Sequence, residues 1–532
     1  MIHRTIAIVS LAVVWAAMGL AQEPAAGPTC ALTLSLVDVE NGEALPGIVQ
    51  LRDAQGHGIE VDSLINRGQG VGRQGPIHGW WVLPKPTTVK VPAAPIVIHA
   101  LAGLETERAT QKIDLTGKSE ASLAIPLVRF YLAREKGQLA GNTHLHLMKL
   151  SKTEADRYLR EVPLADGLDI VFVSYLERAK ADLEYTSNNY SRDDLRKLSH
   201  RDLHFGHGQE HRHNFGPHAE GYGHILLLDI PYVIHPVSIG PGITQQGPDA
   251  PPLQQGIDKA RSLGGKVIWA HNLFGFEDIP NWVTGRVHAN NIFDGSIRGS
   301  FKDTYYRYLN IGLRVPFSTG TDWFIYDFSR VYVASDRAVT PTQWLELLAD
   351  GRSYITNGPL LEFEVDGQPV GSTLDVAPGK HISVRGRAVG RTDFDRLELV
   401  RNGQVVASVP SRAEGKRFVA QLDQAVSIDA PSWLALRTPP PLPAGRQESE
   451  RDVASNEFGG RIFSHTSPVY VQVDGQGVFD PETARGLLAE MQADWKTIEE
   501  QAVFDDEQQR EHVRSVYTEA INTLTKRLQA AQ

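Results

Sequence analysis

Two histidines one residue apart, His144 and His146, lie in the segment GNTHLHL. Imidazole nitrogens are common ligands of zinc and other first-row transition metals. If the segment is a strand, alternate side chains point to the same side, so Asn142, His144 and His146 are expected to share one face. With 19 histidines in 532 residues, such a pair is not diagnostic by itself. Other ligand-type residues must decide whether it binds a metal.

Two further apolar segments end in a residue that can bind a metal. KVIWAH ends in His271, and VPFSTGTD ends in Asp322. An α/β barrel builds its functional site from residues at the C-terminal ends of its strands. A polar residue at such a position can instead be a hydrogen-bonded structural group. Together with the His144 pair, however, three segments of this kind in one region favour a shared site.

The region between residues 200 and 224 contains seven of the 19 histidines and reads HRDLHFGHGQEHRHNFGPHAEGYGH. For most of these residues the composition favours a solvent-exposed loop that binds metal adventitiously. Glu210 differs, because a carboxylate in a cationic or neutral run could bridge two cations. His224 also differs, because it opens the apolar strand HILLLDI. A ligand at a strand start is unexpected in a barrel whose strands are all parallel.

Strands and helices alternate from about residue 135 to residue 358. Ser151 and Glu154 form a capping box that predicts a helix through about Val162, ended by residues 163–167. The apolar strand LDIVFVSY follows. The alternation recurs as LQQGIDKARSLGG before KVIWAH and as FKDTYYRYLN before RVPFSTGTD. This pattern predicts an α/β barrel or a doubly wound sheet over residues 135–358.

The regions on either side of this alternation have different patterns. Residues 30–134 and 359–475 contain short strands separated by Asn-Gly and Asp-Gly turns, and each region predicts a small β-sandwich. Residues 480–532 show two apolar stripes at helical spacing, which are expected to pack on a core, with a partner-binding role as the alternative. The predicted fold is multidomain α/β: a distorted (β/α) barrel, two flanking β-sandwiches and a C-terminal helical hairpin.

Charge and the N-terminus limit the partners and the compartment. The formal net charge of −10 leaves no excess of Lys and Arg to neutralise phosphates, which argues against nucleic acid as a partner. Residues 1–21 have the charge, apolar run and small residues of a cleavable signal peptide, so a periplasmic or extracellular location is expected. An uncleaved membrane anchor is the alternative, and no later segment is long and apolar enough to span a bilayer. Cys30 is the only cysteine, so no internal disulfide can form.

An ordered set of motifs resembles a known superfamily. GNTHLHL, the Glu of GQEH, GYGHILLL, VIWAHN and FSTGTD occur in the order found in PHP-type (polymerase and histidinol phosphatase) metallohydrolases. GRSYITNGPLLEFEVDG is similar to the CehA/McbA branch, and the resemblance covers about residues 135–400. It implies a binuclear centre in which Glu210 and Asp322 are the catalytic carboxylates. The implied ligands are His144, His146 and Asp322 for one metal and His224 and His271 for the other, with Glu210 bridging the two.

The resemblance is incomplete at the family's frequent third metal site. The positions of its ligands fall here on 147–150, on 174–176 and on Phe324, none of which offers the expected His or Asp. Asn142 also replaces the Asp that usually precedes the first pair. Two divalent ions are therefore implied, with Zn²⁺ or Mn²⁺ favoured by the mixed imidazole and carboxylate ligands. The loss of a third ion shifts the expected substrate from phosphomonoesters toward carboxyl esters, amides or carbamates, or phosphodiesters.

The predicted function is thus an exported, metal-dependent hydrolase of a small molecule. Two other functions remain open: a noncatalytic envelope or surface binding protein with a degenerate barrel, and a metal-storage protein that uses residues 200–224. The sequence indicates neither the substrate nor the oligomeric state. Six further side chains are candidates for contacts with the substrate or with the ligands, although each could be purely structural. They are Asn142, Tyr175, Glu177, Arg212, Arg330 and Asn357.

Overall fold

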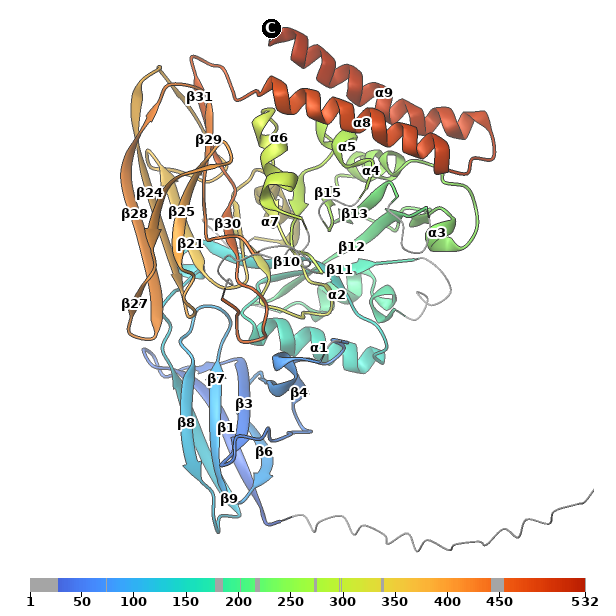
Figure 1. Ribbon diagram of the computed structural model, residues 1–532. Coiled ribbons are helices and arrows are strands. Elements are labelled where there is room, and N and C mark those ends of the chain that lie inside the picture. Colours follow the sequence, from blue (N-terminus) through green and yellow to red (C-terminus); the bar gives the residue numbers. More distant parts are fainter. Residues whose placement is uncertain are drawn as a thin grey trace, which may run out of the picture.

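The structure is a computed structural model that describes residues 27–531, except for residues 73, 178–184, 201, 216–220, 272–274, 296, 298, 336–338 and 442–453. The predicted signal peptide, residues 1–21, lies outside this part, as does His218. No helix in the described part is long and apolar enough to cross a membrane. Figure 1 shows the N-terminal sheets below a central sheet with helices, further sheets beside it, and two long C-terminal helices along its top.

The N-terminal region forms two sheets that share one hydrophobic core. In one sheet, β1 pairs antiparallel with β2 and β6 and parallel with β9, and the other has the antiparallel order β4-β5-β3-β7-β8. Alternate residues of β1 are buried, as expected for a strand with one face on a core. The strands are β1 (Thr29–Asp38), β2 (Ala44–Leu45), β3 (Gly47–Asp53), β4 (Ile65–Asn66), β5 (Trp81–Leu83), β6 (Thr87–Pro92), β7 (Pro95–Leu101), β8 (Ala109–Asp114) and β9 (Glu120–Leu127).

The central sheet is mixed and curls into a half-barrel. Strand β11 is parallel to β10 and β12, whereas β13 is antiparallel to both β12 and β15. The antiparallel strand β13 is therefore a departure from the all-parallel sheet of a regular α/β barrel. The strands are β10 (Gln138–His146), β11 (Ile170–Tyr175), β12 (His204–His213), β13 (Gly223–Leu228), β14 (Ser238–Ile239), β15 (Lys266–Trp269), β16 (Ala289–Asn291), β17 (Phe317–Ser318), β18 (Asp322–Trp323), β19 (Arg330–Ala334) and β20 (Ser353–Thr356).

Helices cover this sheet, and α1 begins at the predicted capping box. The Ser151 hydroxyl accepts a hydrogen bond from the backbone N–H of Glu154, whose carboxylate in turn accepts from the Ser151 N–H. Pro163 lies inside the last turn, and the helix ends at Ala165, within the predicted end at residues 163–167. The helices are α1 (Lys152–Ala165), α2 (Arg192–Leu198), α3 (Pro241–Thr244), α4 (Leu253–Ser262), α5 (Asp278–Val283), α6 (Arg307–Asn310) and α7 (Pro341–Ala349), with a π-helix at Lys302–Tyr306 and 3-10 turns at Pro76–Gly79, Arg134–Lys136 and Thr186–Asn189.

The C-terminal strands form an antiparallel sheet, β22-β21-β24-β28-β27, and a second layer that continues the central sheet through the β20–β30 pair. The predicted turns at Asp366-Gly367 and Asn402-Gly403 are present, and both Asp366 and Asn402 have positive φ angles. The strands are β21 (Leu360–Val365), β22 (Gln368–Pro369), β23 (Thr373–Val376), β24 (Lys380–Gly390), β25 (Arg396–Arg401), β26 (Gln404–Pro410), β27 (Arg412–Glu414), β28 (Arg417–Ile428), β29 (Ser432–Arg437), β30 (Ser464–Thr466) and β31 (Val469–Val473).

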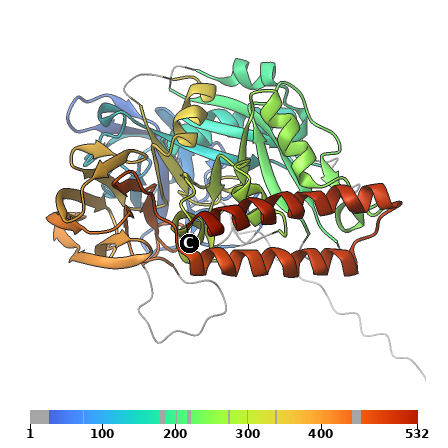
Figure 2. The same cartoon turned by 90° about the horizontal axis from the view of Figure 1, so that it is seen from above.

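Two long helices end the chain, α8 (Pro481–Gln501) and α9 (Glu507–Ala530). The side chain of Asp480 caps α8 by accepting hydrogen bonds from two backbone N–H groups of its first turn. The helices run side by side along one flank of the molecule (Figure 2). Leu487 and Leu524 from their apolar stripes belong to the same hydrophobic cluster as the helices of the central sheet. The expectation that these stripes pack on a core is confirmed.

Candidate metal centre

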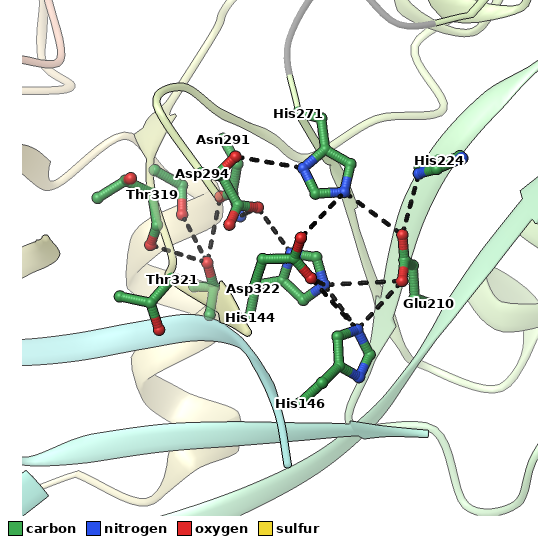
Figure 3. Close-up of polar contacts among 12 residues, drawn as sticks. His144, His146, Glu210, His224, His271, Asn291, Asp294, Thr319, Thr321 and Asp322 are labelled. Carbon is green, nitrogen blue, oxygen red and sulfur yellow. Dashed lines mark hydrogen bonds and ion pairs between the residues drawn. The ribbon is translucent and has the colours of Figure 1, made fainter. Parts of the chain in front are cut away.

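Six residues proposed from the sequence converge at one edge of the central sheet (Figure 3). The edge is where the parallel strands β10, β12 and β15 end. Strand β13 runs the opposite way, so its first residues lie at the same edge as the last residues of its neighbours. His224 at the start of β13 therefore joins the cluster, which explains a position that an all-parallel barrel could not. The six are His144, His146, Glu210, His224, His271 and Asp322.

Strand β10 does not alternate as the sequence suggested. Asn142 pairs with Val171 but Leu145 pairs with Val173, so a β-bulge takes up one additional residue between them. Residues paired across a sheet share a face, which places Asn142 with Leu145 and not with His144. The prediction of one shared face for Asn142 and the two histidines is wrong. Asn142 instead supports the site from behind, since its Oδ1 accepts a 3.0 Å hydrogen bond from the His144 N–H.

One group of ligand atoms gathers around the two histidines of β10. The Nε2 atoms of His144 and His146 lie 2.9 Å apart. Oε2 of Glu210 lies 3.1 Å from His146 Nε2 and 3.9 Å from His144 Nε2. Oδ1 of Asp322 lies 3.5 Å from His144 Nε2 and 3.8 Å from His146 Nε2. Four donor atoms thus surround one point, which is the number that a zinc ion commonly takes.

A second group uses the other oxygens of the same two carboxylates. Oε1 of Glu210 lies 3.1 Å from Nδ1 of His224 and 3.4 Å from Nε2 of His271. Oδ2 of Asp322 lies 3.9 Å from His271 Nε2. Glu210 therefore presents one oxygen to each group, as a carboxylate that bridges two ions does, and the second oxygen of Asp322 is directed toward the second group.

Hydrogen bonds on the outer side of each imidazole fix which nitrogen carries a proton. In all four rings the nitrogen that points away from the cluster contacts an oxygen that can only accept, so this nitrogen donates. The inner nitrogen is then a bare lone pair in the neutral ring. The outer contacts are His144 Nδ1 to Asp294 Oδ2 at 2.7 Å, His146 Nδ1 to Ser174 O at 2.9 Å, His224 Nε2 to Asn214 Oδ1 at 3.1 Å and His271 Nδ1 to Asp294 O at 3.3 Å.

Asp294 is a residue of the site that the sequence analysis missed. It is buried, follows the short strand β16 by three residues, and accepts a 2.9 Å hydrogen bond from Asn291 as well as the one from His144. Strand β16 is parallel to β15, so its end reaches the same edge as His271. The available signal was an acidic residue after a strand, but the strand Ala289–Asn291 is too short and too polar to be recognised.

The electrostatics of the cluster favour bound cations. Although burial opposes its charged form, Arg212 and hydrogen bonds from the surrounding imidazoles hold the pKa of Glu210 well below its usual range. Burial alone would lower the pKa of His271, but the hydrogen bond to Glu210 and the charges of Asp322 and Asp294 raise it to about 10. In the absence of a metal, a proton on His271 thus supplies the positive charge that faces the carboxylates.

The cluster is open on one side only. The side chains of His224, His271 and Asp322 are 20%, 16% and 11% exposed, whereas those of His144 and His146 are fully buried. Solvent and small molecules therefore reach the second group of ligands first.

Two aromatic rings lie beside the first group of ligands. The ring of Trp323 lies 5.0 Å from that of His146 and 5.0 Å from that of Tyr185, so apolar surface shields the first group of ligands. Exclusion of water strengthens the electrostatic interactions there.

Most of the histidine-rich region is not the exposed loop that its composition suggested. Residues 204–213 form β12, and His207, His211 and His213 are buried on the face opposite Glu210. His211 Nδ1 contacts the Val237 carbonyl at 3.0 Å, and His213 Nε2 contacts Asp249 at 2.8 Å. Helix packing against this face buries the rings, so these three histidines are structural.

The remaining candidates divide between the cluster and the surrounding structure. Arg212 lies 3.3 Å from Glu210 and is the only one of them, apart from Asn142, for which a contact with a ligand residue is seen among the described residues. Tyr175 donates a 2.5 Å hydrogen bond to Glu177. Arg330 is buried and donates to the Asp166 carbonyl at 2.6 Å. Asn357 donates to Asp327 at 2.8 Å, so both Arg330 and Asn357 hold loops together.

The positions at which the resemblance places a third metal site hold residues that are not typical metal ligands. Leu147 and Phe324 belong to a hydrophobic cluster, and the Ser174 carbonyl accepts the hydrogen bond from His146. Within the described part of the chain, every group of three or more His, Cys, Asp or Glu side chains with metal-binding spacing belongs to the one cluster around Glu210.

Comparisons with known proteins give no family. No model of a known protein family matches the chain, and no curated protein matches it either. The function must therefore be argued from the geometry of the cluster.

Proposed function

We propose that the protein is a metal-dependent hydrolase with a binuclear centre built on Glu210. One observation carries the proposal: all four imidazoles direct their outer nitrogen at an accepting oxygen, so that their four inner nitrogens face one another and two carboxylates. The inner nitrogens of His144 and His146 lie 2.9 Å apart, a separation that requires a proton or a metal ion shared between them.

The donor set suits two borderline divalent ions. Imidazole with carboxylate is typical of zinc and manganese, whereas calcium and magnesium prefer oxygen ligands alone. The ligands we assign are His144, His146, Asp322 and Glu210 to one ion and His224, His271 and Glu210 to the other. The second ion has fewer protein ligands and lies on the open side of the cluster, which leaves room for water and substrate there.

Two bound ions would supply Lewis acidity that polarises a substrate oxygen and lowers the pKa of water. The chain supplies the positioning. Glu210 and Asp322 hold both ligand groups at fixed spacing, and Asp294 and Ser174 orient the β10 imidazoles. The guanidinium of Arg212, beside Glu210, can bind a negatively charged or carbonyl oxygen of a substrate that enters from the open side.

The proposed reaction is hydrolysis of a carboxyl ester, an amide or carbamate, or a phosphoester in a small molecule. The order of motifs supports membership of the PHP superfamily and its CehA/McbA branch, and residues 1–21 support export. The absence of His or Asp ligands at the third-site positions reduces the charge available to neutralise a phosphate monoester. Esters with one negative charge or none are therefore the better candidates.

The test is the metal content of the purified, extensively dialysed protein, measured by elemental mass spectrometry. We expect about two ions per chain, fewer in Glu210→Ala, and no loss in Glu500→Ala, which removes an exposed carboxylate of α8. His144→Ala and Asp322→Ala should then abolish hydrolysis of responsive esters, carbamates or phosphodiesters. A native protein that retains no ion contradicts the proposal, and two ions without any hydrolysis would favour a noncatalytic binding protein.

A further inference from the structure

Residues 322–325, which include Asp322, have an unfavourable backbone conformation that must be stabilised by contacts with other parts of the protein. Asp322 has a φ of 57° and Phe324 a φ of 54°, which lie in the left-handed region that side chains other than glycine rarely adopt. Such a backbone conformation is energetically unfavourable and persists only where the surrounding structure fixes it. The direction of the Asp322 carboxylate thus depends on what holds residues 322–325.

Two of the contacts come from the central region itself. The Phe324 N–H donates a 2.9 Å hydrogen bond to the His146 carbonyl, which ties the segment to β10. The Ile325 N–H donates to the Tyr158 hydroxyl of α1 at 2.9 Å. These bonds hold the N–H side of the turn and leave the Ile325 carbonyl to another partner.

That partner is Arg67, which lies directly after β4 in the N-terminal region. Its guanidinium is fully buried and donates to the Ile325 carbonyl. The remaining donors form a forked pair with the Asp166 carboxylate at 3.1 and 2.5 Å. Asp166 is the C-cap of α1, where a cation is also favoured by the helix dipole. Arg67 therefore links α1 to the turn after Asp322.

The same N-terminal loop holds the ring of Phe324. A Cβ atom on Gly70 would lie 2.1 Å from Cζ of Phe324, so the ring fills the space that only glycine leaves. Gly70 also has a φ of +81°, a second reason for glycine at this position. The loop thus contacts both the backbone and the side chain of the segment that follows Asp322.

We propose that Arg67 is a positioning residue of the metal centre and that the N-terminal sheets are part of the hydrolase machinery. Through the Ile325 carbonyl, Arg67 fixes the turn that aims Asp322 at both ligand groups. This inference rests on the proposed function, because it requires Asp322 to bind metal. The role requires arginine, since a guanidinium donates in several directions from one plane, whereas lysine offers a point charge that cannot serve Asp166 and Ile325 together.

The test compares Arg67→Lys with Arg391→Lys, a matched control. Arg391 is also nearly buried, pairs with Glu457 at 2.8 Å and donates to the carbonyls of Gly103 and Thr106 in the N-terminal region. It touches nothing in residues 322–325. The probe is Co²⁺ alone, titrated into metal-free protein, with the affinity and the visible absorption spectrum of the bound ion as readouts.

We expect Arg67→Lys to bind Co²⁺ about tenfold more weakly, with an altered spectrum, as is typical when an outer contact of a metal site is lost. Arg391→Lys should keep the native affinity and spectrum even if both variants unfold at a similarly lowered temperature. Equal Co²⁺ binding by the two variants overturns the inference, whereas failure of the native protein to bind Co²⁺ overturns the proposed function instead. If Arg67→Lys does not fold, Gly70→Ala gives the same test, because it displaces Phe324 and leaves every charge in place. Native Co²⁺ binding by folded Gly70→Ala would also overturn the inference.

Discussion

Asp294 offers the sharpest test of the metal centre, because it contacts one imidazole through its side chain and another through its backbone. Its Oδ2 accepts the proton of His144 Nδ1 at 2.7 Å, and its carbonyl oxygen lies 3.3 Å from His271 Nδ1. Asp294→Asn keeps the shape of the side chain and the backbone carbonyl but removes the negative charge. The substitution should therefore weaken the ion held by His144 and spare the ion held by His271.

The size of the effect follows from the burial of the pair. The side chains of both Asp294 and His144 are fully buried, so no solvent screens the interaction. Against the effect of burial, Asp294 holds the pKa of His144 above its usual value, which makes the ring a stronger ligand. Loss of an outer carboxylate of this kind typically costs 10- to 100-fold in metal affinity, which corresponds to about 1.4–2.7 kcal/mol. We expect the upper half of this range.

The assay is a competitive titration of Zn²⁺ against a chromophoric chelator, which resolves the two binding steps. Asp303→Asn is the control, since Asp303 is an exposed carboxylate nine residues further along the chain. A loss of less than twofold in Asp294→Asn, or an equal loss in Asp303→Asn, would refute the assignment of Asp294 as the partner that orients His144. An equal loss in both steps would show that the two ions are not held separately.

Two further predictions concern stability. Glu277 accepts hydrogen bonds from the first N–H groups of α4, yet burial raises its pKa from 4.5 to about 7. The folded protein therefore favours the protonated carboxyl, and the stability gained from this is fully present below about pH 4.5 and is lost as the pH rises through 7. Glu277→Gln should hence gain up to about 3 kcal/mol of unfolding free energy relative to the native protein between pH 5 and 8; urea titrations that show a constant difference would refute this. Leu524→Ala, which removes a buried side chain of α9, should lower the free energy of unfolding by about 2–5 kcal/mol and speed hydrogen exchange in that helix. Leu528→Ala should lower it clearly less, because Leu528 is only half-buried, and equal losses in the two variants would contradict the packing of α9.

The sequence predicted the members of the cluster better than it predicted the sheet that assembles them. Residue type and position after apolar strands were enough to select His144, His271 and Asp322, because these are local properties of the chain. The direction of β13 was not predictable from its own residues, since HILLLDI reads the same whether its partner is parallel or antiparallel. Only the pairing with β12 and β15 reveals why His224 lies at the start of its strand.

Two other errors have a common physical origin in burial. The histidines of β12 looked like a solvated loop because imidazole is polar, but each ring finds an acceptor or a packed face inside the protein. The role of Arg67 was not predicted for the same reason, because a single arginine in a β-rich region usually lies on the surface. Its partners Asp166 and Ile325 are 99 and 258 residues away in sequence, so no local pattern could pair them.

The balance of charge in the cluster connects these observations. With neutral imidazoles, Glu210, Asp322 and Asp294 carry three negative charges and Arg212 one positive charge, which leaves a buried net charge of minus two. Burying such an excess without compensation is costly, and the raised pKa of His271 shows a proton supplying part of it. Two divalent ions reverse the sign and leave a net charge of plus two at the open side of the site. A centre of that charge would attract the oxygen atoms of the esters, carbamates or phosphoesters that we propose as substrates, because they develop negative charge during hydrolysis.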